Sequence, residues 1–363
     1  MSSLTPRPGI MDITPYKGGE SALKNVDRII KLSSNEGPFG PAPSAVEAMK
    51  NASDTQHRYP DGGATRLRNK LADKFNIDAD RIVCGAGSDE ILGLLCRAYA
   101  GPGDEVLYSD HGFLMYPIAA KSVGATPVTA METDLTTDVD AMLAAVTDKT
   151  RIVFVANPNN PTGTYIPKSE MNRLRKGLRD DILLVIDAAY AEFMTEEDYD
   201  AGFELAGSTD NTVMTRTFSK MYGLGGVRLG WSYSSAEIAD VLNRARNPFN
   251  VTALALAAGE AALDDELFVA KTRKHNTKWL RWTEEECRKL GLECTTSYAN
   301  FALVRFPHQT NQSSRQADEF LRSQGIIVRA MASYGLGDCL RITIGTEEEM
   351  LAVMDALKEF MSK

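Results

Sequence analysis

Short apolar segments that alternate with helical patterns between about residues 81 and 231 are the feature that most constrains the fold of this 363-residue chain. Six such segments, rich in valine and isoleucine, are Arg81–Cys84, Glu105–Tyr108, Arg151–Ala156, Ile182–Asp187, Asn211–Thr215 and Leu229–Tyr233. Helical periodicity connects several of them, at Ser88–Ala100, Pro117–Val123 and Lys168–Leu178. Strands without polar alternation must be covered on both faces, so the pattern predicts an α/β fold with a mostly parallel sheet.

The pattern changes near Asn247-Pro248, where a second unit is predicted to begin. A long helical stretch runs from Asp264 to Leu290. Two alternating segments follow at 300–306 and 340–344, with helical patterns at 314–324 and 347–361. We therefore expect a large α/β domain over residues 36–250. Residues 251–363 would form a smaller α+β domain, with residues 1–35 as an N-terminal arm.

Charge and composition exclude several classes of protein. The 40 basic and 49 acidic residues give a net charge of −9, which disfavours binding to nucleic acids or to membrane surfaces. The five cysteines form no C-x-x-C pair and the four histidines show no metal-binding spacing, so no metal site is predicted. The longest apolar run, around Val251–Ala258, is much shorter than the roughly 18–20 residues of a membrane span. The N-terminus lacks the pattern of a secretory signal, and we expect a cytoplasmic location.

A lysine beside a glycine cluster is the first candidate for chemistry. Residues 217–230 read T-F-S-K-M-Y-G-L-G-G-V-R-L-G and follow a predicted strand. Burial would shift Lys220 toward the neutral amine that a Schiff base requires. The hydroxyls of Thr217 and Ser219, together with Arg228, suit a phosphate group. A solvated lysine in a glycine-rich loop remains the alternative.

Polar residues also follow two other predicted strands. Asp187 ends the apolar segment 182–187, and N-P-N-N-P-T-G at 157–163 follows the segment 151–156. The carboxyl ends of parallel strands are where open α/β sheets bind ligands. Asp187 could hold a pyridinium nitrogen in its protonated form, and Asn160 could present a neutral donor. A helix cap and a surface turn are the corresponding structural alternatives.

A strand followed by G-x-G and a helix start is the fourth motif. Gly87 and Ser88 stand where exposed backbone N–H groups would hold a phosphate. A nicotinamide-dinucleotide fold is a rival interpretation, but its third glycine position is occupied by Glu90.

In this order, the four motifs resemble the pyridoxal-phosphate aminotransferases of fold type I over almost the whole chain. Within that group the chain is similar to the histidinol-phosphate aminotransferases. The similar strings are I-T-P-Y at 13–16, L-S-S-N-E at 32–36, R-Y-P-D at 58–61, G-I-I-V-R at 325–329 and L-R-I-T-I-G-T at 340–346.

The resemblance implies a cofactor, pyridoxal 5′-phosphate, and roles for individual residues. Lys220 would bind the cofactor aldehyde covalently and move the substrate proton. Asp187 would pair with the ring nitrogen, Tyr190 and Asn160 would meet the phenolate oxygen, and Phe113 would stack on the ring. The remaining cofactor contacts implied in this chain, mainly to the phosphate, are Gly87, Ser88, Asp89, Thr217, Ser219 and Arg228.

The resemblance also implies substrates and a partner. Arg341 would grip the α-carboxylate of glutamate, and Arg329 would meet the phosphate of histidinol phosphate. Tyr16, Asn35 and Asn160 would be nearby substrate contacts. Tyr59 would reach across to cofactor and substrate in a second subunit, which makes the enzyme a homodimer.

The implied reaction is transamination in histidine biosynthesis. Histidinol phosphate and 2-oxoglutarate would give imidazole-acetol phosphate and glutamate. An aromatic-amino-acid aminotransferase, a phospho-amino-acid decarboxylase and a noncatalytic pyridoxal-phosphate sensor remain alternatives. The chain departs from the family pattern at Ala188, where many relatives have Glu, at His111-Gly112-Phe113, which replaces P-T-Y, and at Ser88, which replaces Ala.

Overall fold

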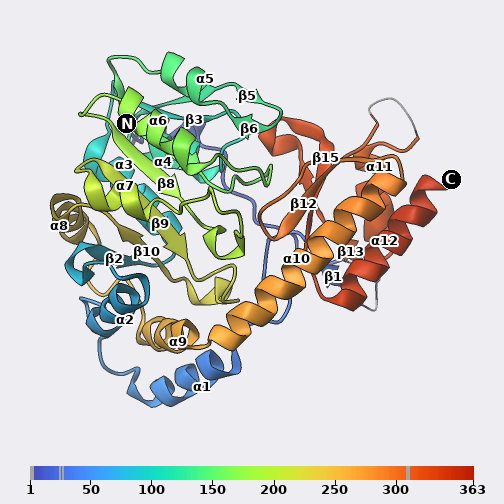
Figure 1. Ribbon diagram of the computed structural model, residues 1–363, viewed down its shortest axis with the longest axis horizontal. Coiled ribbons are helices and arrows are strands. Elements are labelled where there is room, and N and C mark those ends of the chain that lie inside the picture. Colours follow the sequence, from blue (N-terminus) through green and yellow to red (C-terminus); the bar gives the residue numbers. More distant parts are fainter. Residues whose placement is uncertain (1–3, 24–25, 27, 308–310) are drawn as a thin grey trace.

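A seven-stranded sheet forms the centre of the larger part of the molecule (Figure 1). The computed structural model describes residues 4–23, 26, 28–307 and 311–363. The strand order is β2-β10-β9-β8-β7-β3-β4. Their bounds are β2 Ile82–Gly85, β3 Glu105–Ser109, β4 Thr126–Ala130, β7 Thr150–Ala156, β8 Leu183–Asp187, β9 Thr212–Thr217 and β10 Gly230–Tyr233. The pairings of β10 with β2 and with β9 are antiparallel and the other four pairings of this sheet are parallel, so the predicted mostly parallel α/β sheet is confirmed.

The six predicted strands are present to within two residues at each end. The seventh strand, β4, was not predicted, because its sequence T-P-V-T-A lacks a continuous apolar run. It lies at the edge of the sheet, where β3 is its one strand neighbour within the described part of the chain. A proline is tolerated at such an edge.

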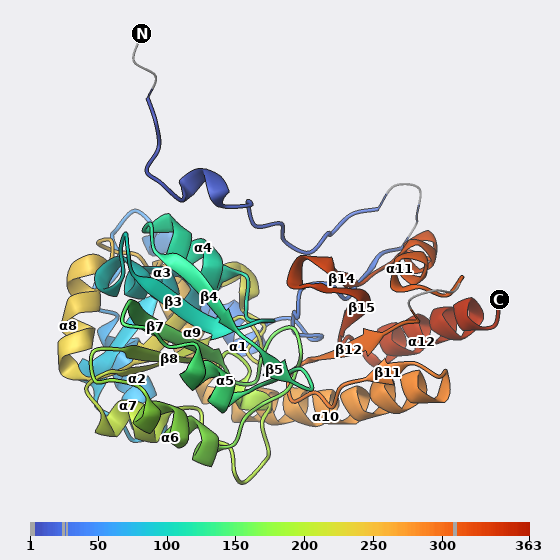
Figure 2. The same ribbon diagram turned by 90° about the horizontal axis from the view of Figure 1, so that it is seen from above.

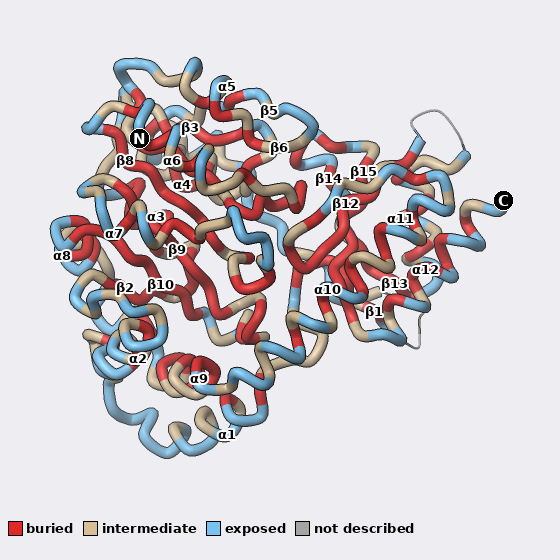
Figure 3. Tube along the Cα trace, in the orientation of Figure 1, coloured by how far each residue is buried: buried red, intermediate tan, exposed pale blue. Residues whose placement is uncertain are grey.

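Alternate residues of the central strands pack into different cores, as the two-residue period of a strand requires. Ile152 and Phe154 of β7 belong to a core with three helices, α3 (Ser88–Tyr99), α4 (Met115–Ser122) and α8 (Ala236–Ala245). Val153 and Val155 belong to a core with α5 (Val139–Ala144) and α6 (Lys168–Gly177). The sheet is therefore covered on both faces, and Figure 3 shows buried chain concentrated along its strands.

A third core joins the β10 side of this sheet to helices from both halves of the chain. These helices are α1 (Pro43–Ala52), α2 (Thr65–Phe75), α7 (Phe203–Ser208) and α9 (Ala253–Asp264). The long helix α10 (Glu266–Lys289) begins beside them and runs toward the second sheet (Figure 1). Asp265 separates α9 from α10, because its carboxylate caps α10 by accepting from the Phe268 N–H at 3.0 Å.

The second sheet has four antiparallel strands in the order β11-β12-β15-β14. Their bounds are β11 Glu293–Cys294, β12 Phe301–Arg305, β14 Arg329–Met331 and β15 Leu336–Thr343. Helices α10, α11 (Ser314–Ser323) and α12 (Glu347–Met361) pack on it around one apolar core. Both α11 and α12 begin with a capping box, at Ser313/Gln316 and Thr346/Glu349.

The N-terminal segment is tied to both parts of the molecule. β1 (Ile30–Lys31) pairs in parallel with β13 (Ile326–Ile327), which ties residues 30–31 to the part of the molecule that holds the smaller sheet. Further toward the N-terminus, the Arg7 guanidinium donates to the Ser122 carbonyl at 2.8 Å. Figure 2 shows this segment extended along one side of the molecule, between α4 and β14.

The remaining elements are short. A two-stranded ribbon is formed by β5 (Glu132–Thr133) and β6 (Thr136–Thr137). Short 3-10 helices lie at η1 Ile10–Asp12, η2 Ser53–Thr55, η3 Ala79–Arg81, η4 Ala191–Phe193, η5 Gly225–Val227 and η6 Ala332–Tyr334. In the part of the chain that the structure describes, no helix has the length and hydropathy to span a bilayer.

Candidate active site

A cavity of about 300 Å³ lies where the two sheets meet, at the carboxyl ends of β7, β8 and β9. Its walls come from segments that are far apart in the sequence, because parallel strands end at the same edge of a sheet. The sequence-predicted residues that line it are Tyr16, Asn35, Ser88, Asp89, Phe113, Asn160, Asp187, Tyr190, Thr217, Ser219, Lys220, Arg228, Arg329 and Arg341. Gly87 is adjacent to this lining, and Tyr59 lies elsewhere.

Lys220 enters the cavity three residues after β9 ends. Its Nζ donates to the Ser34 carbonyl at 3.3 Å and lies 6.0 Å from the centroid of the Tyr190 ring. Burial, followed by the positive charge of Arg341, lowers the pKa of Lys220 to about 8. A substantial fraction of this amine is therefore neutral near physiological pH, and a neutral amine is a nucleophile.

Asp187 is the last residue of β8 and is only 5% exposed. Its Oδ2 accepts from the Tyr116 hydroxyl at 3.0 Å, and its Oδ1 accepts from the Thr215 hydroxyl at 3.3 Å. Burial raises the pKa of Asp187 to about 6, and the negative charge of Asp89 acts in the same direction. In the described part of the chain its hydrogen-bond donors are neutral, so the carboxylate can accept a bond from a cationic ligand.

Tyr190 and Asn160 line the cavity, and hydrogen bonds join Tyr190 to the N-terminal segment and Asn160 to β15. The Asn35 side-chain amide donates to the Tyr190 hydroxyl at 2.8 Å. Asn35 has a left-handed backbone (φ 54°), and its N–H donates to the Thr343 hydroxyl at 2.9 Å. Arg341 of β15 donates to the side-chain Oδ1 of Asn160 and to the backbone carbonyl of Ser33. These bonds hold residues from three distant segments against one another.

The start of α3 forms the opposite end of the cavity, and it offers an anion site. Gly87 has φ 86°, and a Cβ there would overlap the Arg228 guanidinium. Arg228 is itself left-handed, with φ 58°, and its Nη2 donates to Asp89 at 3.1 Å. The Ser219 hydroxyl accepts from Arg228 Nη1 at 3.4 Å. Free helical N–H groups, hydroxyls and a guanidinium gathered in one place suit a phosphate.

Two arginines lie at paired positions on neighbouring strands. Arg329 of β14 and Arg341 of β15 are register partners, and cross-strand partners project on the same side of a sheet. Arg341 is 6% exposed, and its Nε has no hydrogen-bond partner among the residues that the structure describes. Burial lowers the pKa of Arg341 from its ordinary value. A buried guanidinium with an unused donor can bind an anion.

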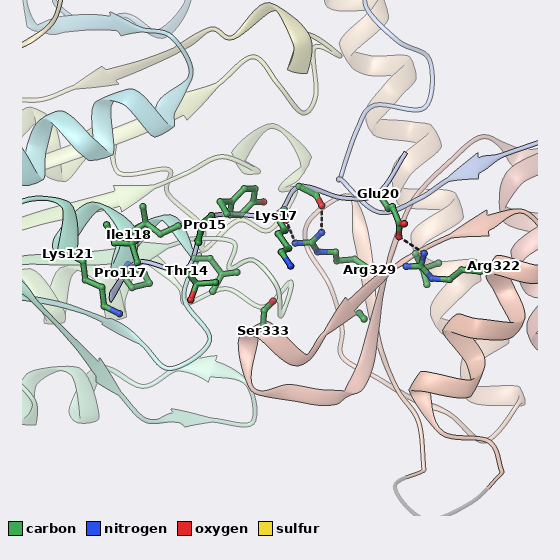
Figure 4. A pocket seen from close by; sticks show the side chains of 16 residues that line it. Thr14, Pro15, Lys17, Glu20, Pro117, Ile118, Lys121, Arg322, Arg329 and Ser333 are labelled. Atoms are coloured by element: carbon green, nitrogen blue, oxygen red, sulfur yellow. Dashed lines mark hydrogen bonds and ion pairs between the residues drawn. The ribbon is translucent and has the colours of Figure 1, made fainter. Parts of the chain in front are cut away.

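A second cavity, of about 770 Å³, adjoins the first through Tyr16, Gly18 and Arg329 (Figure 4). The N-terminal segment forms one wall, and α4 with the β14 region forms the other. Arg329 donates to the Lys17 carbonyl at 2.6 Å and to the Gly18 carbonyl at 2.8 Å. Its guanidinium therefore fastens the N-terminal segment beside the site.

Tyr59 does not line either cavity. Its ring is 81% exposed and is stacked on Phe249, with 4.6 Å between the ring centroids. The family resemblance implies that Tyr59 contributes to the active site of a second subunit, and its position on one isolated chain does not test that prediction.

Sequence reasoning missed Tyr116, which is 1% exposed and bonded directly to Asp187. Its ring stacks on Phe154 at 4.6 Å and contacts Phe113 edge-on at 5.9 Å. Phe113, which is predicted to stack on the cofactor ring, is one helical turn before Tyr116 in the sequence. That spacing was the available signal, but an apolar helix face explains the same aromatic pair.

Comparison with known proteins places the chain in a family. The model of the class I and II aminotransferases matches residues 27–357. The histidinol-phosphate aminotransferase of Paramagnetospirillum magneticum is 63% identical over 361 residues, which are 99% of each chain. That of Rhodospirillum rubrum is 58% identical over 98% of this chain and 97% of its own.

A solved structure agrees with these sequences. The crystal structure of histidinol-phosphate aminotransferase from Sinorhizobium meliloti in complex with pyridoxal-5′-phosphate superposes with a TM-score of 0.91, at 28% identity over 99% of each chain. The chain belongs to the class I and II aminotransferases and, within them, to the histidinol-phosphate aminotransferases.

Proposed function

We propose that this chain is a pyridoxal-phosphate-dependent enzyme of histidine biosynthesis. It transfers the amino group of histidinol phosphate to 2-oxoglutarate, giving imidazole-acetol phosphate and glutamate, and it catalyses the reverse reaction. The observation that carries this proposal is that Lys220, Asp187 and two register-paired arginines lie at one cavity in a chain 63% identical to a histidinol-phosphate aminotransferase.

The residues of the cavity fit pyridoxal 5′-phosphate. Asp187 is buried and bonded to neutral donors, so a protonated ring nitrogen would supply its missing cation. The space beside Gly87, which any Cβ would fill, opens onto Arg228 and the start of α3, where the phosphate would bind. Lys220 carries the amine with a lowered pKa that the aldehyde requires. When bound, the cofactor supplies that aldehyde and a ring that stabilises negative charge at the substrate α-carbon.

Different residues of the cavity would have different roles in transamination. Lys220, with a pKa of about 8, takes the proton from the α-carbon of the amino donor and returns a proton to the acceptor. Tyr190, held by Asn35, and Asn160, held by Arg341, would orient the face of the cavity nearest the reacting atoms. Phe113 would cover the ring and exclude water.

Two unlike substrates must be bound in turn, and the arginines account for both. Arg341 would form a bidentate pair with the carboxylate of glutamate, for which it has an unused Nε donor. Arg329 and Tyr16, at the passage to the larger cavity, would bind the phosphate of histidinol phosphate. An aromatic amino acid lacks a group for Arg329, which disfavours the aromatic-aminotransferase alternative.

The working enzyme is proposed to be a cytoplasmic homodimer. Tyr59 and Phe249 form an exposed aromatic stack, which a second subunit would cover. The five cysteines are free thiols, as is usual for proteins of a reducing compartment.

A panel of single-turnover reactions tests the substrate. The cofactor-loaded protein is mixed separately with histidinol phosphate, glutamate, phenylalanine, tyrosine and threonine phosphate, and the change in cofactor absorbance is followed. Histidinol phosphate and glutamate should react with efficiencies roughly tenfold or more above the other compounds. Equal reactivity of phenylalanine and histidinol phosphate would reject the proposed substrate.

The variant Arg329→Gln tests whether Arg329 binds the phosphate of histidinol phosphate. It removes the proposed phosphate contact, so the efficiency with histidinol phosphate should fall much more than the efficiency with glutamate. An equal loss with both compounds would show that Arg329 does not distinguish them.

A further inference from the structure

Tyr116 is a buried hydroxyl group that the proposed reaction does not yet use. It lies on α4, and its ring is enclosed by Phe154, stacked at 4.6 Å and inclined by 4°, and by the edge-on rings of Phe113 and Tyr108. This packing fixes the position of the hydroxyl oxygen, which lies 3.0 Å from Asp187 Oδ2. The pKa of Tyr116 is raised well above its ordinary value by burial, so the hydroxyl remains protonated and can act only as a neutral donor toward the carboxylate.

The carboxylate that receives this bond is in an unfavourable place for a charge. Asp187 is 5% exposed, and the nearby negative charge of Asp89 adds to the effect of burial. In the described part of the chain, the cations that line the cavity are bonded to other groups: Lys220, Arg228, Arg329 and Arg341. The donors left to stabilise the charged form of Asp187 are the hydroxyls of Tyr116 and Thr215 and the N–H of Ala189.

The Tyr116 bond is the shorter of the two hydroxyl bonds, at 3.0 Å compared with 3.3 Å for Thr215. A hydrogen bond to an ionised group favours the ionised form, and it fixes the direction of the acceptor. We infer that Tyr116 is a positioning residue of this enzyme, whose hydroxyl keeps the Asp187 carboxylate ionised and holds it toward the cofactor ring. This inference rests on the proposed role of Asp187, not on the identity of the substrate.

The test removes one hydroxyl and leaves the ring in place. In Tyr116→Phe the aromatic packing is kept, while Asp187 loses its shorter hydroxyl donor. The matched control is Tyr108→Phe, because Tyr108 is a buried neighbour in edge-on contact with Tyr116, at 5.8 Å, and is not bonded to Asp187. Thermal unfolding of both variants verifies that they fold.

The first measurement is the titration of Asp187 in the full-length, cofactor-free chain. Carbon-13 NMR of aspartate-labelled protein follows the carboxyl group, which is assigned with Asp187→Asn. The pKa of Asp187 should rise by about one to two units in Tyr116→Phe and stay unchanged in Tyr108→Phe. An unchanged pKa in Tyr116→Phe, or an equal rise in the control, would overturn the inference.

The second measurement is the dissociation constant of pyridoxal 5′-phosphate, obtained by equilibrium dialysis. It should increase about tenfold in Tyr116→Phe, because the carboxylate is less ionised and less well directed. In the loaded enzyme, kcat should fall while KM for glutamate and for histidinol phosphate changes little, since Tyr116 is not among the residues that line the cavity.

These outcomes separate the inference from the proposed function. A shifted Asp187 pKa with an unchanged cofactor dissociation constant would overturn the positioning role. Failure of the protein to react with histidinol phosphate would reject the substrate, but it would alter neither the Asp187 titration nor the dissociation constant of the cofactor.

Discussion

Lys220 owes its chemical character to its surroundings and not to its side chain alone. An exposed lysine has a pKa of about 10.4 and is almost entirely charged at neutral pH. In this cavity the loss of water and the neighbouring Arg341 guanidinium both disfavour the ammonium form, and its pKa falls to about 8. The residue is therefore prepared for covalent capture of an aldehyde before any substrate arrives.

This environment predicts a pH profile for cofactor capture. In the cofactor-free protein, the rate of covalent capture of pyridoxal 5′-phosphate should rise with pH and reach half its maximum near the Lys220 pKa of about 8. The sign follows because only the neutral amine attacks, and it predominates above the pKa. The rate is measured by borohydride reduction and the mass of the full chain.

Two variants provide controls for this pH profile. Lys220→Ala should show no captured cofactor, and Arg341→Gln should move the midpoint to higher pH because a neighbouring cation is removed. A profile that keeps rising toward the pKa of a free lysine would contradict the effect of the cavity.

At the scale of the element, the site depends on how strands end and how one helix begins. Asp187 is the last residue of β8, Thr217 is the last of β9, and Ser88 is the first of α3. The turn into α3 uses a left-handed glycine, Gly87, and leaves its backbone open toward Arg228. A side chain at Gly87 would require both a strained φ and displacement of that guanidinium.

Gly87→Ala should therefore weaken binding of pyridoxal 5′-phosphate by about tenfold or more. The matched control is Gly93→Ala, further along α3, where an added Cβ meets no atom within 4 Å. The control should bind the cofactor normally and should be stabilised by up to about 1 kcal/mol, as expected for alanine in a helix. Fluorescence titration and thermal unfolding measure the two effects. Equal cofactor affinity in both variants would show that the turn does not serve the phosphate.

At the scale of the whole molecule, the site lies between two units that several segments connect. Helix α10 runs from the core beside the large sheet to the small sheet, and β1 pairs with β13 and packs in the same core as α10. Asn35 forms hydrogen bonds with Tyr190 of the larger unit and with Thr343 of the smaller unit. The distance between Lys220 and the arginines proposed to bind the substrates is therefore set by the packing of the whole chain.

The proposed dimer predicts a mass of twice the 39.7 kDa of one chain in sedimentation experiments. It also predicts complementation between two impaired variants, Tyr59→Ala and Lys220→Ala. A mixed dimer contains one site with an intact Lys220 and an intact Tyr59 from the partner, so subunit exchange should restore activity. If mixing restores nothing, Tyr59 serves its own subunit or neither.

The order of elements and the chemical types at the ends of strands were determined by the sequence alone. Buried strands need apolar residues on both faces, so the pattern 81–231 predicted six of the seven strands and the parallel sheet. The edge strand β4 was not predicted, because its proline and threonine residues interrupt any apolar run. Lys220, Asp187 and Arg228 were identified because four motifs in this order resemble the pyridoxal-phosphate aminotransferases, whereas each motif alone also had a structural alternative. The domain limits at residues 36 and 250 stay a prediction.

Only the tertiary structure decided which groups act on one another. Tyr116 and Asp187 are 71 residues apart, and Arg341 and Asn160 are 181 residues apart, so no local pattern couples them. These contacts form because distant segments of the chain converge at the cavity. The same segments exclude water from Lys220 and Asp187, and this burial shifts the pKa values of both residues. Residue type is a local property of the chain, whereas burial and proximity exist only after the two sheets have packed together.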